Sequence, residues 1–150
     1  MPDVFISYAQ VNRTAALATQ TALREGGVSV FLAGTSVEPG ASWPVEIDRA
    51  IRSADLVLVL ASRAACQSAW VQHEVGIAVG ARRKIIPVVW DMPPSELPGV
   101  LAGVQALDLA GRTPEDAQRE FEEICKRIRG DKVRGAVVLG AIFYGLSKLG

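Results

Sequence analysis

The sequence predicts an α/β fold in which helices cover both faces of a five-stranded parallel sheet. Short aliphatic segments alternate with longer segments of helical periodicity along the chain. The aliphatic segments are apolar at successive positions, as in strands that are buried on both faces. A sheet of this kind with five strands most often has the flavodoxin-like order 2-1-3-4-5.

Two strands and one helix form the first part of the predicted fold. Val4–Tyr8 is a short apolar strand, and apolar residues at helical spacing predict an amphipathic helix over Arg13–Glu25. A Gly-Gly pair at positions 26–27 ends this helix, because glycine readily adopts the conformation found after a helix C-terminus. Val28–Leu32 is the second strand, and the loop Gly34–Ser42 follows it.

The next three elements are a helix, a strand and a second helix. Pro44–Ser53 is a predicted helix, with Ser42 as its N-cap and Pro44 in its first turn. Leu56–Ala61 is an unbroken aliphatic strand, and a helix over about Ser68–Arg83 comes after it.

Two more strands and a closing helix complete the predicted domain. The strands Ile85–Trp90 and Val104–Leu109 flank a proline-rich loop. The helix Pro114–Gly130 begins after Thr113, which is a suitable N-cap. Since no repeat or low-complexity linker interrupts this pattern, we expect residues 1–130 to form one domain.

Residues 131–150 form a separate segment that is first basic and then apolar. Its uncharged part, Gly135–Leu146, would span about 18 Å as a helix, which is short of the roughly 30 Å hydrocarbon core of a membrane. The basic residues before it fit the cytoplasmic side of a membrane anchor. A membrane contact, a self-association helix and the beginning of a further region therefore remain alternatives.

The composition excludes several classes of function. Sixteen basic residues balance sixteen acidic ones, so no overall positive charge attracts nucleic acid. The two cysteines, Cys66 and Cys125, have no metal-binding spacing, and His73 is the only histidine in the sequence. We therefore expect a reduced, cytoplasmic protein without a metal site.

The predicted topology gathers polar residues at one edge of the sheet. In the order 2-1-3-4-5, ligands bind outside the carboxyl ends of strands 1 and 3. Trp70 and Glu74 lie four positions apart on the helix after strand 3, so they share one helix face. The residues that leave the two strands are Ser7, Tyr8 and Ala9 after strand 1, and Ala61, Ser62 and Arg63 after strand 3.

Several chemistries are disfavoured at this edge. The chain has neither a G-x-G-x-x-G motif after strand 1 nor a Walker A motif, and it has no aspartate at the end of strand 3 for a phosphoacceptor site. A Ser-His hydrolase is also disfavoured, because His73 points about 100° away from Glu74 around the helix.

The chemistry that this edge still allows is cleavage of a glycosidic bond by a single carboxylate. A carboxylate beside an aromatic ring can stabilise an oxocarbenium ion, and neutral nicotinamide leaves a ribose without needing a general acid. Each residue also has a structural alternative. Glu74 could form a surface ion pair with Arg82 or a lysine, Trp70 could belong to the core, and Ser7 and Ser62 could satisfy backbone groups.

Three motifs in this order resemble the Toll/interleukin-receptor (TIR) domain family over about residues 3–130. They are Phe5-Ile6-Ser7-Tyr8, the loop from Ser36 to Trp43, and Ser68-x-Trp70-x-x-x-Glu74. The W-x-x-x-E spacing resembles bacterial members in particular. Family members often carry an aspartate just after strand 2, where this chain has Leu32-Ala33-Gly34.

The resemblance implies a role for each matching residue. Glu74 matches the catalytic glutamate, and the mobile BB loop would contribute to both the substrate site and the assembly contacts. The implied substrate-binding residues are Ser7, Tyr8, Ala9, Ser36, Trp43, Ser62 and Trp70. The implied assembly residues of the BB loop are Val37, Glu38, Pro39 and Gly40.

The resemblance also implies two classes of function. The first is an NAD⁺ glycohydrolase or cyclase that needs no cofactor beyond its substrate, is activated by assembly into a homo-oligomer or filament, and serves bacterial anti-phage defence or cell death. The second is a non-catalytic TIR–TIR scaffold, or an effector that mimics host TIR domains.

Overall fold

The computed structural model describes residues 2–25, 27–33, 45–110, 113, 116 and 119. Its sheet has five parallel strands in the order β2-β1-β3-β4-β5, which confirms the predicted fold class and strand order. The strands are β1 (Val4–Ser7), β2 (Val30–Leu32), β3 (Leu56–Leu60), β4 (Ile85–Val89) and β5 (Leu107–Asp108).

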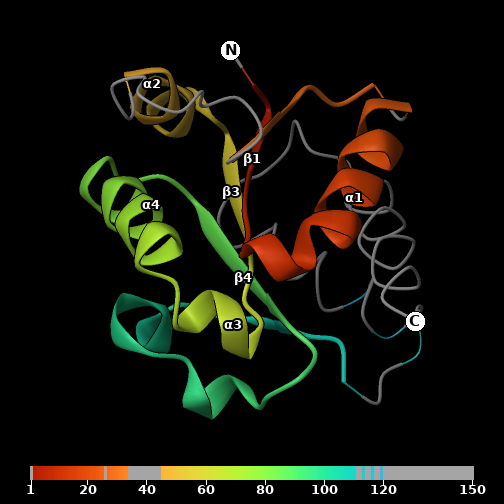
Figure 1. The fold of residues 1–150 in the computed structure, drawn as a ribbon, viewed down its shortest axis with the longest axis vertical. Coiled ribbons are helices and arrows are strands. Elements are labelled where there is room, and N and C mark those ends of the chain that lie inside the picture. The colour runs from red at the N-terminus through yellow and green to blue at the C-terminus, as the bar shows by residue number, and fades with distance from the viewer. Residues whose placement is uncertain are drawn as a thin grey trace.

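Helices cover both faces of the sheet (Figure 1). The helix α1 lies on one side, whereas α2 and α4 pack against each other on the opposite side. The α-helices are α1 (Arg13–Glu25), α2 (Val45–Ser53), α3 (Arg63–Cys66) and α4 (Ala69–Gly80). Three 3₁₀ helices complete the described elements, namely η1 (Gln10–Asn12), η2 (Pro94–Glu96) and η3 (Gly99–Gly103).

The core lies along the central strands. Every residue of β1, β3 and β4 is buried, as expected of parallel strands that are covered on both faces. At the β2 edge, the ring of Phe31 stacks on that of Phe5 with 5.5 Å between the ring centroids. The apolar runs that predicted these strands are therefore the runs that the helices cover.

Two strands begin later than the sequence pattern predicts. The strand β2 begins at Val30 because Val28 belongs to the turn that closes α1, where its N–H donates to the Leu23 carbonyl oxygen at 2.9 Å. Gly27, with φ of +87°, makes this turn, as predicted for the Gly-Gly pair.

The strand β5 begins at Leu107 rather than Val104. Val104 is extended but caps the end of η3, in which Leu101 is buried and which packs on α4. Pairing with β4 therefore begins only at Leu107.

The helix boundaries otherwise follow the predictions closely. The helix α1 has the predicted bounds, and Thr113 Oγ1 accepts a hydrogen bond from the Asp116 N–H at 3.2 Å, as expected of an N-cap. The short helix α3 was not predicted. The whole predicted loop Gly34–Ser42 and Pro44 lie outside the described residues. The same holds for most of 114–130 and for all of 131–150. No helix among the described residues is long and apolar enough to cross a membrane.

Candidate active site

The helix α4 places Glu74 against the sheet. Ser68 caps this helix by accepting a hydrogen bond from the Val71 N–H at 3.3 Å. Glu74 lies on the face that also carries the buried residues Val71, Val75 and Ala78, and its exposed fraction is 0%. The alternative of a surface ion pair for Glu74 is therefore wrong.

A hydroxyl group from the end of β1 holds the Glu74 carboxyl group. The buried Ser7 Oγ donates to Glu74 Oε1 at 2.7 Å, although the two residues lie 67 positions apart in the sequence. The second carboxyl oxygen, Oε2, is buried and has no hydrogen-bond partner among the described residues. A buried polar atom without a partner is costly, so its presence in a folded protein calls for an explanation such as a catalytic role or a bound ligand.

Burial raises the pKa of Glu74 from 4.5 to about 8, while the Ser7 hydrogen bond and the Trp70 indole each lower it in part. The carboxyl group is therefore mostly protonated at pH 7 in the ligand-free protein. A cation bound beside it would reverse this balance, because an adjacent positive charge favours the ionised form. Such a carboxyl group can become an anion when a cationic substrate arrives.

Tyr8 adds a second buried polar atom without a partner. Its exposed fraction is 4%, and its hydroxyl group has no hydrogen-bond partner within the described ranges. Burial raises the pKa of this phenol, the Arg13 guanidinium lowers it, and the charge of Glu74 raises it. The Tyr8 hydroxyl group thus lies within electrostatic reach of both a carboxylate and a guanidinium.

Ser62 joins the loop after β3 to the loop after β1. Its hydroxyl group donates to Asn12 Oδ1 at 2.6 Å and accepts from the Ala65 N–H at 3.1 Å, which caps α3. Both Ser62 and Asn12 are buried. Because the one hydroxyl hydrogen is used on Asn12, Ser62 holds the two loops together, and its predicted contact with substrate remains a prediction.

The predicted site residues meet at the carboxyl ends of β1 and β3, as the topology requires. Ser7, Tyr8 and Trp70 each interact with Glu74 there, and the buried Ala9 continues the chain from Tyr8. Ser36, Trp43 and the assembly residues from Val37 to Gly40 lie outside the described residues.

Sequence reasoning missed two residues of this region, Asn12 and Arg13. Both belong to the segment in which η1 turns the chain from β1 into α1. The signal for them was that they are polar residues just after strand 1, at the edge where ligands bind.

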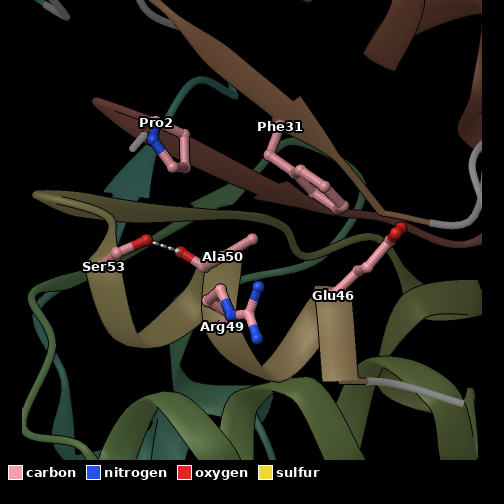
Figure 2. Close-up of a pocket in the computed structure, with 6 residues that line it drawn as sticks. All are labelled: Pro2, Phe31, Glu46, Arg49, Ala50 and Ser53. Carbon is pink, nitrogen blue, oxygen red and sulfur yellow. Dashed lines mark hydrogen bonds between the residues drawn. The ribbon is translucent and has the colours of Figure 1, made fainter.

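The cavity drawn in Figure 2 is a different feature from this site. It has a volume of about 380 Å³ and lies between the chain start, β2 and α2. Its lining residues are Pro2, Phe31, Glu46, Arg49, Ala50 and Ser53, and none of them is a predicted site residue.

Comparison with known proteins agrees with this fold. The profile of the TIR domain family matches residues 4–125. A relative from Brachypodium distachyon, named probable 2′ cyclic ADP-D-ribose synthase BdTIR, is 32% identical over 97 residues. That alignment covers 63% of this chain and 43% of the relative, so the chain spans less than half of that protein's length.

Three solved structures share the fold at identities below 25%. The TIR domain of the Toll-related receptor TRR-2 from Hydra magnipapillata has a TM-score of 0.66 and 24% identity, over 86% of this chain and 99% of that one. A TIR-STING receptor from C. gigas in complex with 2′,3′-cGAMP has a TM-score of 0.64 and 22% identity, over 85% and 39% of the two chains. The TIR domains of the activated Roq1 resistosome have a TM-score of 0.56 and 21% identity, over 97% and 84%. With the family profile spanning most of its length, this chain belongs to the TIR domain family.

Proposed function

We propose that this TIR domain cleaves the bond between nicotinamide and ribose in NAD⁺. The observation that carries the proposal is the Glu74 carboxyl group, which is fully buried, held by Ser7 through Oε1, and left without a described partner at Oε2. The name of the plant relative, a probable cyclic ADP-ribose synthase, supports the same substrate class.

The chemistry follows from the charges of the substrate. The pyridinium ring of NAD⁺ stacks on the half-buried Trp70, and its positive charge favours ionisation of Glu74. The bond between C1′ and the pyridinium nitrogen breaks, and its electron pair leaves with neutral nicotinamide. The Glu74 carboxylate stabilises the oxocarbenium ion that remains on the ribose.

A nucleophile then completes the reaction at C1′. Water attacks and loses a proton to give ADP-ribose, or a nucleophile within the same molecule attacks and gives a cyclic isomer. No cofactor beyond NAD⁺ takes part in this scheme, because the substrate supplies the leaving group and the protein supplies the carboxylate.

Assembly and biological setting belong to the same proposal. We propose activation by TIR–TIR self-assembly through residues 37–40, in cytoplasmic defence or cell death of the bacterial type. The W-x-x-x-E spacing of Trp70 and Glu74 supports the bacterial type. The Roq1 resistosome, whose TIR domains share this fold, supports assembly. A membrane contact through Gly135–Leu146 is part of this proposal because of the basic residues before it.

Release of nicotinamide from NAD⁺ tests the proposal, with the products separated by mass. We expect wild-type protein at high concentration to release nicotinamide, and Glu74→Gln to lose at least about 100-fold in rate, because the amide cannot supply the negative charge. Glu46→Gln, which changes an exposed glutamate of α2, is the matched control and should keep wild-type activity. Equal activity of wild type and Glu74→Gln would refute the proposal, and absence of release even after clustering would favour the scaffold.

A further inference from the structure

The cavity in Figure 2 separates the helix α2 from the edge strand β2. The α2 residues that line it lie three or four positions apart and form one stripe along the helix, namely Glu46, Arg49, Ala50 and Ser53. Two members of this stripe, Ala50 and Ser53, have small side chains. These small side chains leave a space of about 380 Å³ between the helix and the strand.

The ring of Phe31 forms the wall of this cavity on the β2 side (Figure 2). Phe31 is half-buried, whereas the other two residues of the strand, Val30 and Leu32, are buried. Its ring stacks on that of the fully buried Phe5, with an angle of 8° between the ring planes. Since Phe5 covers one side of the Phe31 ring, the surface that remains borders the cavity. A further aromatic ring placed there would extend the stack.

The rim of the cavity carries one acidic and one basic side chain. Glu46 and Arg49 are both exposed, and neither forms an ion pair within the described part of the chain. A ligand with a single charge would meet one opposite and one like charge here, and it would also lose part of its hydration. The rim therefore gives no advantage to a cation or to an anion.

The rest of the lining is largely apolar. Pro2 from the chain start, Phe31 and Ala50 supply carbon surface on three sides. The volume of about 380 Å³ lies at the small end of the range for cavities that bind small molecules. A ligand that fills it is therefore small, apolar over most of its surface and able to pack on an aromatic ring.

We propose that this cavity binds an uncharged, flat aromatic molecule of one or two rings that packs on Phe31. The site is separate from that of Glu74, because none of the residues that line it belongs to that site. The inference therefore does not depend on the proposed function, and the failure of one leaves the other intact.

Amide chemical shifts of the full chain measure binding directly, with indole as the uncharged aromatic probe. We expect saturable shifts that are largest around Phe31 and Ala50, with Kd on the order of 1 mM for so small a ligand. No saturable binding would overturn the inference. Shifts centred on Trp70 and Glu74 would overturn it too, because the ring would then occupy the proposed NAD⁺ site.

Filling the cavity tests where indole binds. Ala50→Leu should weaken indole binding at least about tenfold, because the larger side chain takes up the space of the ligand. Leucine is a good helix former and the cavity has room for it, so we expect the variant to fold. Ala102→Leu makes the same change at an exposed position of η3 and should bind indole like the wild type. Wild-type affinity in Ala50→Leu would overturn the inference.

Replacing the aromatic wall tests the contact with the ring. Phe31→Leu keeps the wall apolar but removes the aromatic surface, so indole binding should weaken about 2- to 10-fold. Thermal unfolding establishes that each variant is folded. Unchanged indole affinity in Phe31→Leu would show that the cavity does not select aromatic rings.

Two charged analogues test the selection by charge. At pH 7 tryptamine is a cation and indole-3-acetate is an anion, and both keep the indole ring. We expect neither to bind more tightly than indole, since each meets a like charge at the rim. Tighter binding of either analogue would overturn the preference for an uncharged ligand.

The alternative occupant is a side chain from a second copy of the chain. Sedimentation of the wild type and Ala50→Leu at equal concentration distinguishes the two occupants. We expect the same molar mass for both proteins. A lower mass for Ala50→Leu, with no indole binding by the wild type, would show that the cavity is a contact between copies and that the inference is wrong.

Discussion

At the scale of single residues, the Ser7–Glu74 hydrogen bond controls when the carboxyl group ionises. The bond favours the charged form and so opposes the effect of burial, which raises the pKa of Glu74 to about 8. If the ionised form is the active one, kcat/KM for NAD⁺ should rise with pH up to this pKa. Removing the bond in Ser7→Ala raises the pKa further, so we expect the rising limb to move up by about one pH unit.

The pH profile of kcat/KM distinguishes this role from simple support of the fold. Ser53→Ala is the control, because the Ser53 hydroxyl group donates to the Ala50 carbonyl oxygen within its own helix rather than to Glu74. Its profile should match that of the wild type. If the rising limb of the Ser7→Ala profile lies at the same pH as in the wild type, or at lower pH, then Ser7 does not set the pKa of Glu74.

The same residues show what the sequence can and cannot predict about the site. The sequence predicted that Glu74 lies beside Trp70, because residues four positions apart on a helix share one face whatever the rest of the fold. The partner of Glu74 was not predictable in this way, since Ser7 lies 67 positions away and only the packed sheet brings it near. Arg13 was missed because its interaction with Tyr8 depends on the 3₁₀ turn η1 between them, which no periodic pattern in the sequence predicts.

At the scale of elements, the end of α4 carries a strained residue. Arg82 has φ of +57° and is the one non-glycine residue with positive φ among the described residues. It follows the helix end, where the Arg83 N–H donates to the Ala78 carbonyl oxygen at 2.9 Å. Arg82→Gly should raise the free energy of unfolding by about 0.5–1 kcal/mol, because glycine adopts this conformation without a steric cost.

Urea denaturation measures this effect. Arg83→Gly is the matched control at the next position, where φ is not positive, and it should lower the free energy of unfolding. A loss of stability in Arg82→Gly as large as that in Arg83→Gly would show that the Arg82 side chain contributes more than its backbone strain costs.

Element boundaries were less predictable than element types. Each predicted strand in the described ranges exists, because both-face apolar runs are hard to bury in another way. The predicted start of β5 was wrong because Val104 caps η3, and the ladder with β4 begins only at Leu107. The helix α3 was missed because it is only one turn long and depends on the Ser62 cap and on Asp91.

At the scale of the whole molecule, burial of Glu74 makes stability depend on pH. Below pH 4.5 the carboxyl group is protonated in both the folded and the unfolded chain. Between pH 4.5 and about 8 the unfolded chain loses this proton while the folded protein keeps it, so stability falls as pH rises. This one group contributes a slope of up to about 1.4 kcal/mol per pH unit in that window, and none above it.

Glu74→Gln removes this slope, because glutamine does not titrate. We therefore expect the free energy of unfolding of the variant, minus that of the wild type, to grow by a few kcal/mol from pH 5 to pH 8. Urea denaturation at both pH values measures the difference, in which all other titrating groups cancel.

Glu46→Gln, at an exposed position on α2, should show no such growth. A constant difference for Glu74→Gln would mean that the pKa of the buried carboxyl group equals its pKa in the unfolded chain. A difference that shrinks as pH rises would mean that the folded protein stabilises the charged form of Glu74. Growth of the difference together with loss of nicotinamide release would show that the protein gives up stability at neutral pH to keep this carboxyl group in its active site.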